Sequence, residues 1–144
     1  MKIGLIAGNF DVIHPGYTHM FNYMNERVDH VWVLLDNNDY KERPEKLKPI
    51  LSAKEREQTV RLLKGVDHVI HYKSEKDLLL ILTGLPKVYP QFQFIRFLGD
   101  DYKGRNRNSF TNHPNETIHF IPREHNWSTS LFKEKISNSL QNKN

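Results

Sequence analysis

The sequence predicts an α/β fold, a doubly wound parallel sheet of about five strands with helices on both faces. Three observations lead to this prediction. Short apolar segments rich in β-forming residues alternate with segments of helical character. The segments 2–8 and 30–36 are apolar almost throughout, which is typical of parallel strands covered on both faces. The 144 residues contain no internal repeat and no low-complexity linker, so we expect one domain.

The start of the chain predicts a strand, a turn and a helix. Residues 2–8 form an apolar run that ends in glycine, as a buried strand does. The polar segment 9–15 follows as a turn. Residues 16 to about 25 then have helical spacing, with Phe21 and Met24 pointing toward the core.

The next segments repeat this alternation. Residues 30–36 (HVWVLLD) predict the second strand. Ser52 and Glu55 are spaced as a capping box that opens a helix, and Gly65 ends it. Residues 66–72 predict a third short strand.

The third helix is predicted at residues 78–82. Ser74 is placed to cap it, Gly84 to end it, and Pro86 lies beyond. Residues 92–98 predict the fourth strand. Each crossover between parallel strands is expected to be right-handed.

The end of the chain predicts a fifth strand at 117–122 and a final helix capped by Ser128. We therefore expect a single domain over residues 1–140, followed by a polar tail at 141–144. The apolar side of the final helix is formed by Leu131, Phe132, Ile136 and Leu140.

Composition narrows the classes of function. The chain carries 21 Lys and Arg against 17 Asp and Glu, a net charge of +4, which favours anionic partners such as nucleic acids, nucleotides or phosphorylated metabolites. The absence of cysteine excludes a disulfide scaffold, a thiolate zinc site and a cysteine nucleophile. No segment approaches the ~18 apolar residues that span a membrane, and the N-terminus does not resemble a signal peptide. We therefore expect a cytoplasmic protein with no membrane partner.

Ligands of such sheets bind beyond the carboxyl ends of the strands, at the point where the strand order reverses. We therefore expect ligand-binding residues in the segment after Gly8 and in the loop after Leu98. The glycine turn of the first segment exposes backbone amides, and the helix start that follows favours anions. His14 lies just before that helix. The alternative interpretation is an ordinary turn with a surface histidine.

Residues 8–17 (GNFDVIHPGY) resemble the G-x-F-D-x-x-H-x-G-H signature of the cytidylyltransferase-like nucleotidyltransferases. Residues 122–130 (PREHNWSTS) are similar to the second family signature, R-T-E-G-I-S-T-T. Residues 98–104 (LGDDYKG) resemble the G-D-D-W-x-G-K segment of glycerol-3-phosphate cytidylyltransferases. Arg56 falls at a family arginine. The resemblance implies a Rossmann-like fold of the HxGH type, closest to glycerol-3-phosphate cytidylyltransferase.

The family reaction is attack by a substrate phosphate on the α-phosphate of a nucleoside triphosphate, with release of pyrophosphate. Catalysis then consists of positioning and neutralisation of charge. By resemblance, the catalytic residues are His14, Lys46 and Arg123, and the substrate-binding residues are Asp11 and Arg56. The nucleotide-binding residues implied are Gly8, Asn9, Phe10, Gly16, Tyr17, Asp100, Ser128, Thr129 and Ser130.

Several of these residues have a second interpretation. Lys46 belongs to the charged segment 37–51, which is either a solvated loop or a lid that brings a lysine to the phosphates. Asp11 either orients its loop by hydrogen bonds or helps to hold Mg²⁺. Arg56 is otherwise a helix-surface arginine, and Asp100 otherwise a turn residue. The resemblance implies Mg²⁺ bound with the nucleotide, and it implies a homodimer.

The sequence departs from the family pattern at the second histidine of H-x-G-H, which is Tyr17 here. A phenol donates a neutral hydrogen bond, and if that histidine is charged in the transition state the exchange costs about tenfold in rate. His19 points to another side of the helix. Asn126 and Trp127 replace a glycine and an isoleucine of the second signature.

Three hypotheses follow. The first is transfer of a cytidylyl group from CTP to a small phosphorylated alcohol. The second is an adenylyltransferase that uses ATP, because residues 48–56 (KPILSAKER) also resemble the K-P-L-F-S-x-x-E-R run of phosphopantetheine adenylyltransferases. The third is a non-catalytic nucleotide-binding or nucleic-acid-binding protein. No basic stripe runs along a predicted helix, so nucleic acid is not an expected partner.

Overall fold

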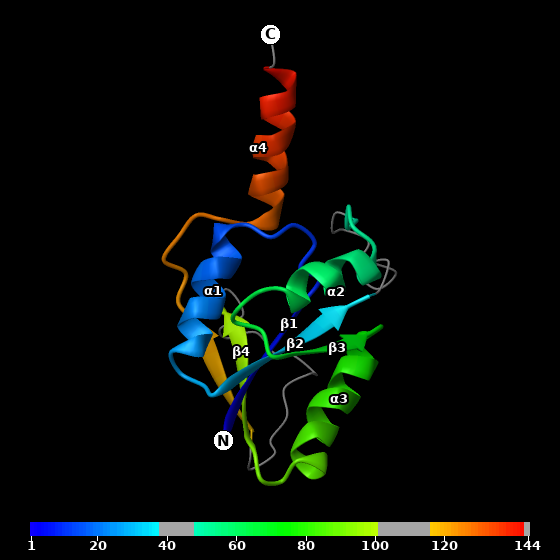
Figure 1. The fold of residues 1–144 in the computed structure, drawn as a ribbon, viewed down its shortest axis with the longest axis vertical. Coiled ribbons are helices and arrows are strands. Elements are labelled where there is room, and N and C mark those ends of the chain that lie inside the picture. Colours follow the sequence, from blue (N-terminus) through cyan, green and yellow to red (C-terminus); the bar gives the residue numbers. More distant parts are fainter. Residues whose placement is uncertain (38–47, 101–115, 143–144) are drawn as a thin grey trace.

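The computed structural model describes residues 1–37, 48–100 and 116–142. Within these ranges five strands form one parallel sheet in the order β3-β2-β1-β4-β5, and a helix follows each of the first three strands along the chain (Figure 1). The predicted fold class is confirmed. The elements in chain order are β1 (Lys2–Gly8), α1 (Pro15–Asn25), β2 (His30–Asp36), α2 (Ala53–Arg61), β3 (His68–Tyr72), α3 (Glu75–Val88), β4 (Gln93–Gly99), β5 (Glu116–Ile121) and α4 (Thr129–Gln141).

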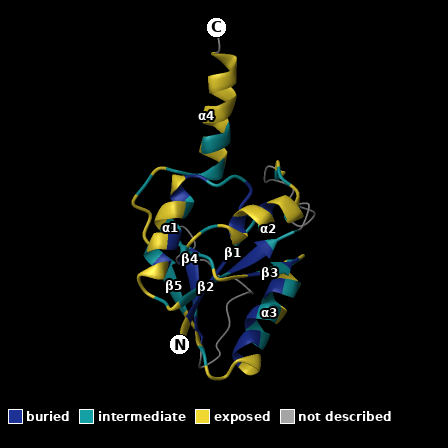
Figure 2. Cartoon of the chain, in the orientation of Figure 1, coloured by how far each residue is buried: buried dark blue, intermediate teal, exposed yellow. Residues whose placement is uncertain are grey.

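Helices cover both faces of the sheet, because the apolar side chains of each helix face the strands. α1 and α2 contribute Phe21, Met24 and Val60 to a core on one face. α3 contributes its buried leucines, among them Leu82, to a second core on the other face. Figure 2 shows the strands buried between these layers. The sheet is therefore doubly wound, as the alternation of strands and helices predicts.

The strand order reverses at β1, which pairs with β2 on one side and with β4 on the other. The connection after β1 therefore leads toward one edge of the sheet, and the connection after β4 toward the other edge. This divergence opens space above the carboxyl ends of the two strands, where ligands of doubly wound sheets bind. The loop that follows Gly8 lies at this point.

The third helix is longer than the sequence predicts. α3 continues through Gly84 and Pro86 to Val88, whereas we expected it to end at Gly84. Leu82, Leu85 and Pro86 are buried on the sheet side, and this burial offsets the cost of glycine and proline inside a helix. An added Cβ at Gly84 would meet no atom within 4 Å, so this glycine faces open space.

The third strand begins two residues later than expected, at His68. Asp67, which we placed in the strand, exchanges hydrogen bonds with the start of the neighbouring strand β2 instead. Its amide donates to the carbonyl of Val31 at 2.8 Å, and its carboxylate accepts from the Val31 amide, also at 2.8 Å. Because a side-chain oxygen of Asp67, and not a backbone carbonyl, accepts from the Val31 amide, the backbone pairing of the two strands begins at the next residue.

The last helix extends away from the sheet (Figure 1). Ser128 caps it, as predicted, by accepting a hydrogen bond from the Leu131 amide. None of its residues is buried. Leu131, Ile136 and Leu140, which we expected on the apolar side of this helix, are exposed.

Two leucines of α3 offer a matched test of the packing. Leu82 is fully buried, and Leu80 is 63% exposed on the same helix. We predict that Leu82→Ala lowers the free energy of unfolding by about 2–5 kcal/mol, because it leaves a cavity. Leu80→Ala should change it by no more than about 0.5 kcal/mol. Urea denaturation followed by circular dichroism measures both, and equal losses would contradict the packing described for α3.

Candidate functional site

The loop between β1 and α1 contains a strained backbone conformation at Phe10. Its φ angle is 52°, in the left-handed region that bulky residues rarely adopt. The Phe10 ring is buried, and its centre lies 5.3 Å from the ring centre of Tyr17 and 6.1 Å from that of Phe21. Packing of the ring therefore holds the strained loop in place.

His14 caps the N-terminus of α1. Its Nδ1 accepts a hydrogen bond from the Gly16 amide at 3.0 Å, so in the neutral ring the proton is on Nε2. Burial, followed by the charges of His125 and Arg123, lowers the pKa of His14 below the ordinary value of 6.5. At neutral pH the side chain is therefore an uncharged donor through Nε2.

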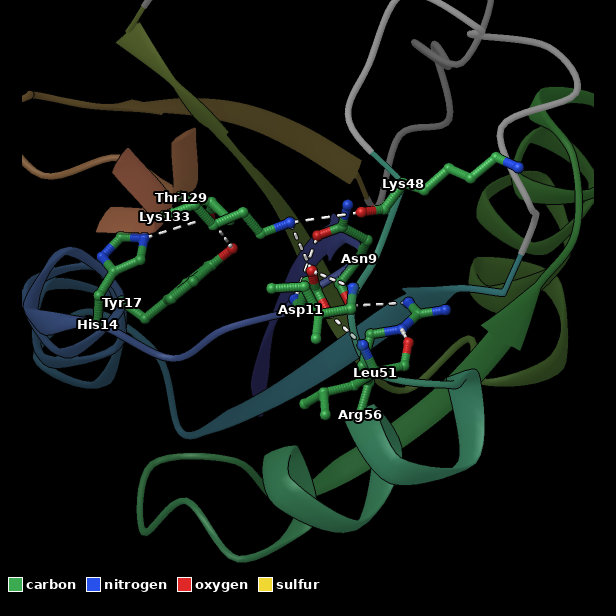
Figure 3. Close-up of polar contacts among 10 residues, drawn as sticks. Asn9, Asp11, His14, Tyr17, Lys48, Leu51, Arg56, Thr129 and Lys133 are labelled. Atoms are coloured by element: carbon green, nitrogen blue, oxygen red, sulfur yellow. Dashed lines mark hydrogen bonds and ion pairs between the residues drawn. The ribbon is translucent and has the colours of Figure 1, made fainter. Parts of the chain in front are cut away.

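Three polar side chains from two helices meet at one point. Oγ1 of Thr129, the first residue of α4, lies 3.3 Å from Nε2 of His14 and 3.2 Å from the hydroxyl of Tyr17. Figure 3 shows His14 and Tyr17 directed toward Thr129. The structure thus brings together residues of the two sequence signatures, at the adjacent N-termini of α1 and α4.

Gly16 is required by the packing at this point. A Cβ built on it would lie 2.7 Å from Cε1 of His14 and 3.0 Å from Cε1 of His125. Any larger residue would therefore displace the capping histidine.

Asp11 holds three parts of the chain together. Its carboxylate accepts hydrogen bonds from the amides of Ile50, at 2.7 Å, and Leu51, at 2.9 Å. It also forms an ion pair with Nζ of Lys133 at 2.7 Å, and the Asp11 side chain is fully buried. Burial by itself would raise the pKa of Asp11, but the hydrogen bonds from Leu51, Lys133 and Ile50 outweigh it and lower the pKa. These contacts orient the loop, which is one of the two roles expected for this residue.

Arg56 is buried on α2 beside the same loop. Its Nη1 donates to the carbonyl oxygens of Asn9 and Asp36, and its Nε donates to that of Leu51. The guanidinium thereby joins the carboxyl ends of β1 and β2 to the start of α2. We expected a helix-surface arginine as the alternative to substrate binding, and the burial contradicts that alternative. Phosphate binding by Arg56 stays a prediction.

The second signature forms the turn that leads into α4. Arg123 donates to the carbonyl oxygens of His125, at 3.3 Å, and Trp127, at 2.7 Å. These bonds hold the turn, and the guanidinium charge contributes to the lowered pKa of His14. The Ser128 hydroxyl is used in capping, and Ser130 is exposed. Phosphate binding by Arg123, Ser128 and Ser130 stays a prediction.

The remaining predicted residues lie at the borders of the site or beyond the described ranges. Gly8 ends β1, and a Cβ there would lie 3.2 Å from the Phe10 ring. Asn9 accepts a hydrogen bond from the Asp11 amide. Asp100 is exposed directly after β4. Lys46 lies outside the described residues.

Two residues of the site were missed by the sequence analysis. Lys133 lies one helical turn after Thr129, and its Nζ reaches both Asp11 and the carbonyl oxygen of Lys48, the latter at 3.5 Å. The i, i+4 spacing from Thr129 was the available signal, because such residues share one face of a helix. His125 stacks on His19 with ring centres 5.1 Å apart, and no spacing rule predicts that contact.

A family model described as cytidylyltransferase-like matches residues 5–83. The chain is 31% identical over 70 residues to an FAD synthase of Methanocorpusculum labreanum, which covers 49% of each chain. It is 32% identical over 74 residues to an FAD synthase of Methanohalophilus mahii, which covers 51% of this chain and 50% of that one. The chain thus matches about half the length of these curated relatives.

Two solved structures share the fold. A lipopolysaccharide core biosynthesis protein from Thermoplasma volcanium has a TM-score of 0.58 and 23% identity, covering 85% of this chain and 95% of its own. A protein described as a nicotinate-nucleotide adenylyltransferase, from Vibrio parahaemolyticus, has a TM-score of 0.67 and 13% identity, covering 96% of this chain and 88% of its own. In the described part of this chain, no helix has the length and apolar character needed to cross a membrane.

The buried carboxylate of Asp11 leads to a pH-dependent prediction. Asp11→Asn removes the charge that pairs with Lys133, so we expect a loss of about 3 kcal/mol in the free energy of unfolding at pH 7. Because the pKa of Asp11 is lowered in the folded chain, its contribution is fully present above the ordinary value of 3.8 and disappears as the pH falls below it.

Urea denaturation of both proteins at several pH values between 7 and 3 measures this difference. Glu26→Gln is the control, because Glu26 pairs with Arg27 on the surface and its loss should be near zero at every pH. A difference between Asp11→Asn and the unmodified chain that stays constant down to pH 3 would contradict the assignment.

Proposed function

The chain belongs to the cytidylyltransferase-like family, and on that premise we propose that it is a nucleotidyltransferase that transfers AMP from ATP to a small phosphate monoester. A phosphate oxygen of the acceptor forms a bond to the α-phosphorus of the nucleotide. The bond from that phosphorus to the oxygen bridging the α- and β-phosphates breaks, and pyrophosphate leaves with the electron pair. The step needs no nucleophile from the protein.

The observation that carries this proposal is the meeting of His14, Tyr17 and Thr129 at the N-termini of two helices. Helix N-termini present unpaired amides and a partial positive charge, which favour phosphate groups. Nε2 of His14 and the hydroxyl of Tyr17 each lie within hydrogen-bond distance of the Thr129 hydroxyl, so one phosphate can replace these two contacts. Donors held in advance at this point stabilise the charge that develops on the phosphates.

We propose ATP, rather than CTP, as the nucleotide substrate for two reasons. The named relatives are FAD synthases, and FAD consists of FMN joined to AMP. Residues 48–56 also resemble an adenylyltransferase segment, and they lie against the loop after β1 through Asp11 and Arg56. Use of CTP is the second candidate. It is supported by residues 98–104, of which 101–104 lie outside the described residues.

Mg²⁺ is proposed to arrive with the nucleotide. Among the described residues no three His, Asp or Glu side chains form a group that holds a metal ion, and the Asp11 carboxylate is occupied by Lys133 and two amides. These residues therefore do not form a metal site of their own. Mg²⁺ is commonly bound largely by water and substrate phosphates.

Pyrophosphate release tests the proposal directly. We predict release when the full chain is given Mg²⁺, ATP and an acceptor from a panel of FMN, nicotinate mononucleotide, phosphopantetheine and glycerol 3-phosphate. The rate with CTP should be at least about tenfold lower, which corresponds to about 1.4 kcal/mol of discrimination. Faster release with CTP would favour the cytidylyltransferase alternative. No release with either nucleotide and any acceptor would contradict the proposed reaction.

His14 permits a test that separates catalysis from folding. His14→Asn retains a side chain that caps helices well but removes the Nε2 donor, whereas His14→Ala removes both. We predict that both variants lose at least about a hundredfold in kcat. Only His14→Ala should lose stability, by about 1 kcal/mol. Pyrophosphate release and urea denaturation measure the two effects, and full activity of His14→Asn would exclude Nε2 from the mechanism.

A further inference from the structure

His125 lies between the starts of α1 and α4, although neither helix contains it. Its Nδ1 accepts a hydrogen bond from the Trp127 amide at 3.0 Å, which attaches the ring to the turn before α4. Its Cε1 lies 3.0 Å from the position of a Cβ built on Gly16, in the first turn of α1. In Figure 1 the connection from β5 to α4 curves around this end of α1. The ring is therefore held against the helix start that His14 caps.

Two imidazoles thus meet at Gly16, one from each sequence signature. Cε1 of His14 lies 2.7 Å from the same Cβ position that Cε1 of His125 approaches. The charge of His125 is the second cause, after burial, of the lowered pKa of His14. The two rings therefore contact one short stretch of backbone and act on each other through their charges.

The hydrogen bonding of His125 repeats that of His14. In each ring Nδ1 accepts from the amide two residues further along the chain, so the neutral ring carries its proton on Nε2. Burial, followed by the charges of His19 and Arg123, lowers the pKa of His125 below the ordinary value of 6.5. Among the residues that the structure describes, none accepts a hydrogen bond from Nε2 of His125. This nitrogen is a donor that the surrounding turn does not use.

The sequence gains an imidazole in one signature and lacks one in the other. Tyr17 stands where the first pattern has its second histidine, and His125 stands where the second pattern has a glutamate. A carboxylate beside phosphate groups would repel them, whereas an imidazole N–H donates to them. Stacking on the ring of His19, with ring centres 5.1 Å apart, keeps the additional imidazole in place. The chain therefore retains two imidazoles beside the start of α1.

We propose that His125 is a further phosphate-binding residue, which donates through Nε2 to the outer phosphates of the nucleotide. The inference rests on the proposed nucleotidyl transfer and adds a residue to its phosphate site. His14 and Tyr17 converge on one point, the Thr129 hydroxyl, whereas a triphosphate extends beyond one point. A second imidazole beside His14 extends the site along the triphosphate, toward the groups that leave as pyrophosphate.

Two substitutions separate the Nε2 donor from the structural role of the ring. His125→Asn places an oxygen near the position of Nδ1, so it keeps the acceptor for the Trp127 amide and removes the Nε2 donor. His125→Gln places an amide N–H near the position of Nε2 and removes the Nδ1 acceptor.

Calorimetric titration of the full chain measures the Kd of inorganic tripolyphosphate mixed with an equal amount of Mg²⁺. The titration is done at about pH 8, above the ordinary pKa of histidine, so that the rings are neutral. In His125→Asn we expect the Kd to rise by about three- to tenfold, as for the loss of one neutral hydrogen bond. In His125→Gln it should stay close to the value of the unmodified chain.

His68→Asn is the matched control, because His68 is an exposed histidine at the start of β3, at the opposite end of the sheet from the site. It should leave the Kd unchanged, and thermal denaturation verifies that each variant is folded. A loss of affinity in His125→Gln that equals or exceeds the loss in His125→Asn would show that the ring only holds the turn, and would overturn the inference. An unchanged Kd in His125→Asn, or no binding of tripolyphosphate to the unmodified chain, would overturn it as well.

Pyrophosphate release on the same samples separates this inference from the proposed function. Tripolyphosphate binding that depends on the Nε2 donor, without turnover of any nucleotide, would refute the transfer reaction and retain the role of His125. Turnover with a KM of ATP that is unchanged in His125→Asn would retain the reaction and refute that role. If both proposals hold, His125→Asn raises the KM of ATP and leaves the KM of the acceptor as it is.

Discussion

The architecture of the site depends on one buried carboxylate. Asp11 follows the first strand, and its two oxygens bind the amides of Ile50 and Leu51 and the ammonium group of Lys133. A buried carboxylate is tolerated only when its charge is compensated and its lone pairs are satisfied. Here the partners that compensate it come from the segment before α2 and from α4. The electrostatic requirement of one side chain therefore fixes the relative positions of three segments.

Backbone groups, more than side chains, determine how the neighbouring cations are used. Arg56 donates to three carbonyl oxygens, and Arg123 donates to two. His14 likewise caps α1 through Nδ1, while its Nε2 contacts the Thr129 hydroxyl. Each of these side chains holds the local backbone beside the site. Such preorganisation reduces the rearrangement that ligand binding requires.

The sequence predicted the sheet, the helix caps and the position of the first signature, because these depend on local periodicity and on residues close together in the chain. Contacts between residues far apart in the sequence could not be predicted. Nothing in the spacing of Asp11 and Lys133 indicates that they form an ion pair. The predicted length of α3 was wrong, because burial of Leu85 and Pro86 against the rest of the fold overrides the local signals that end a helix. The exposure of Leu131, Ile136 and Leu140 was also missed, because apolar spacing does not reveal whether a helix has a neighbour.

The last helix supplies Thr129 and Lys133 to the site but buries none of its own residues. Its attachment to the body therefore relies on polar contacts and on the edge contact of Phe132 with the His14 ring, rather than on a fully buried hydrophobic interface. A ligand that bridges the starts of α1 and α4 would add to those contacts, and its binding free energy would include the work of holding the helix in place. The affinity for such a ligand and the stability of the contact between α4 and the rest of the chain are then thermodynamically linked.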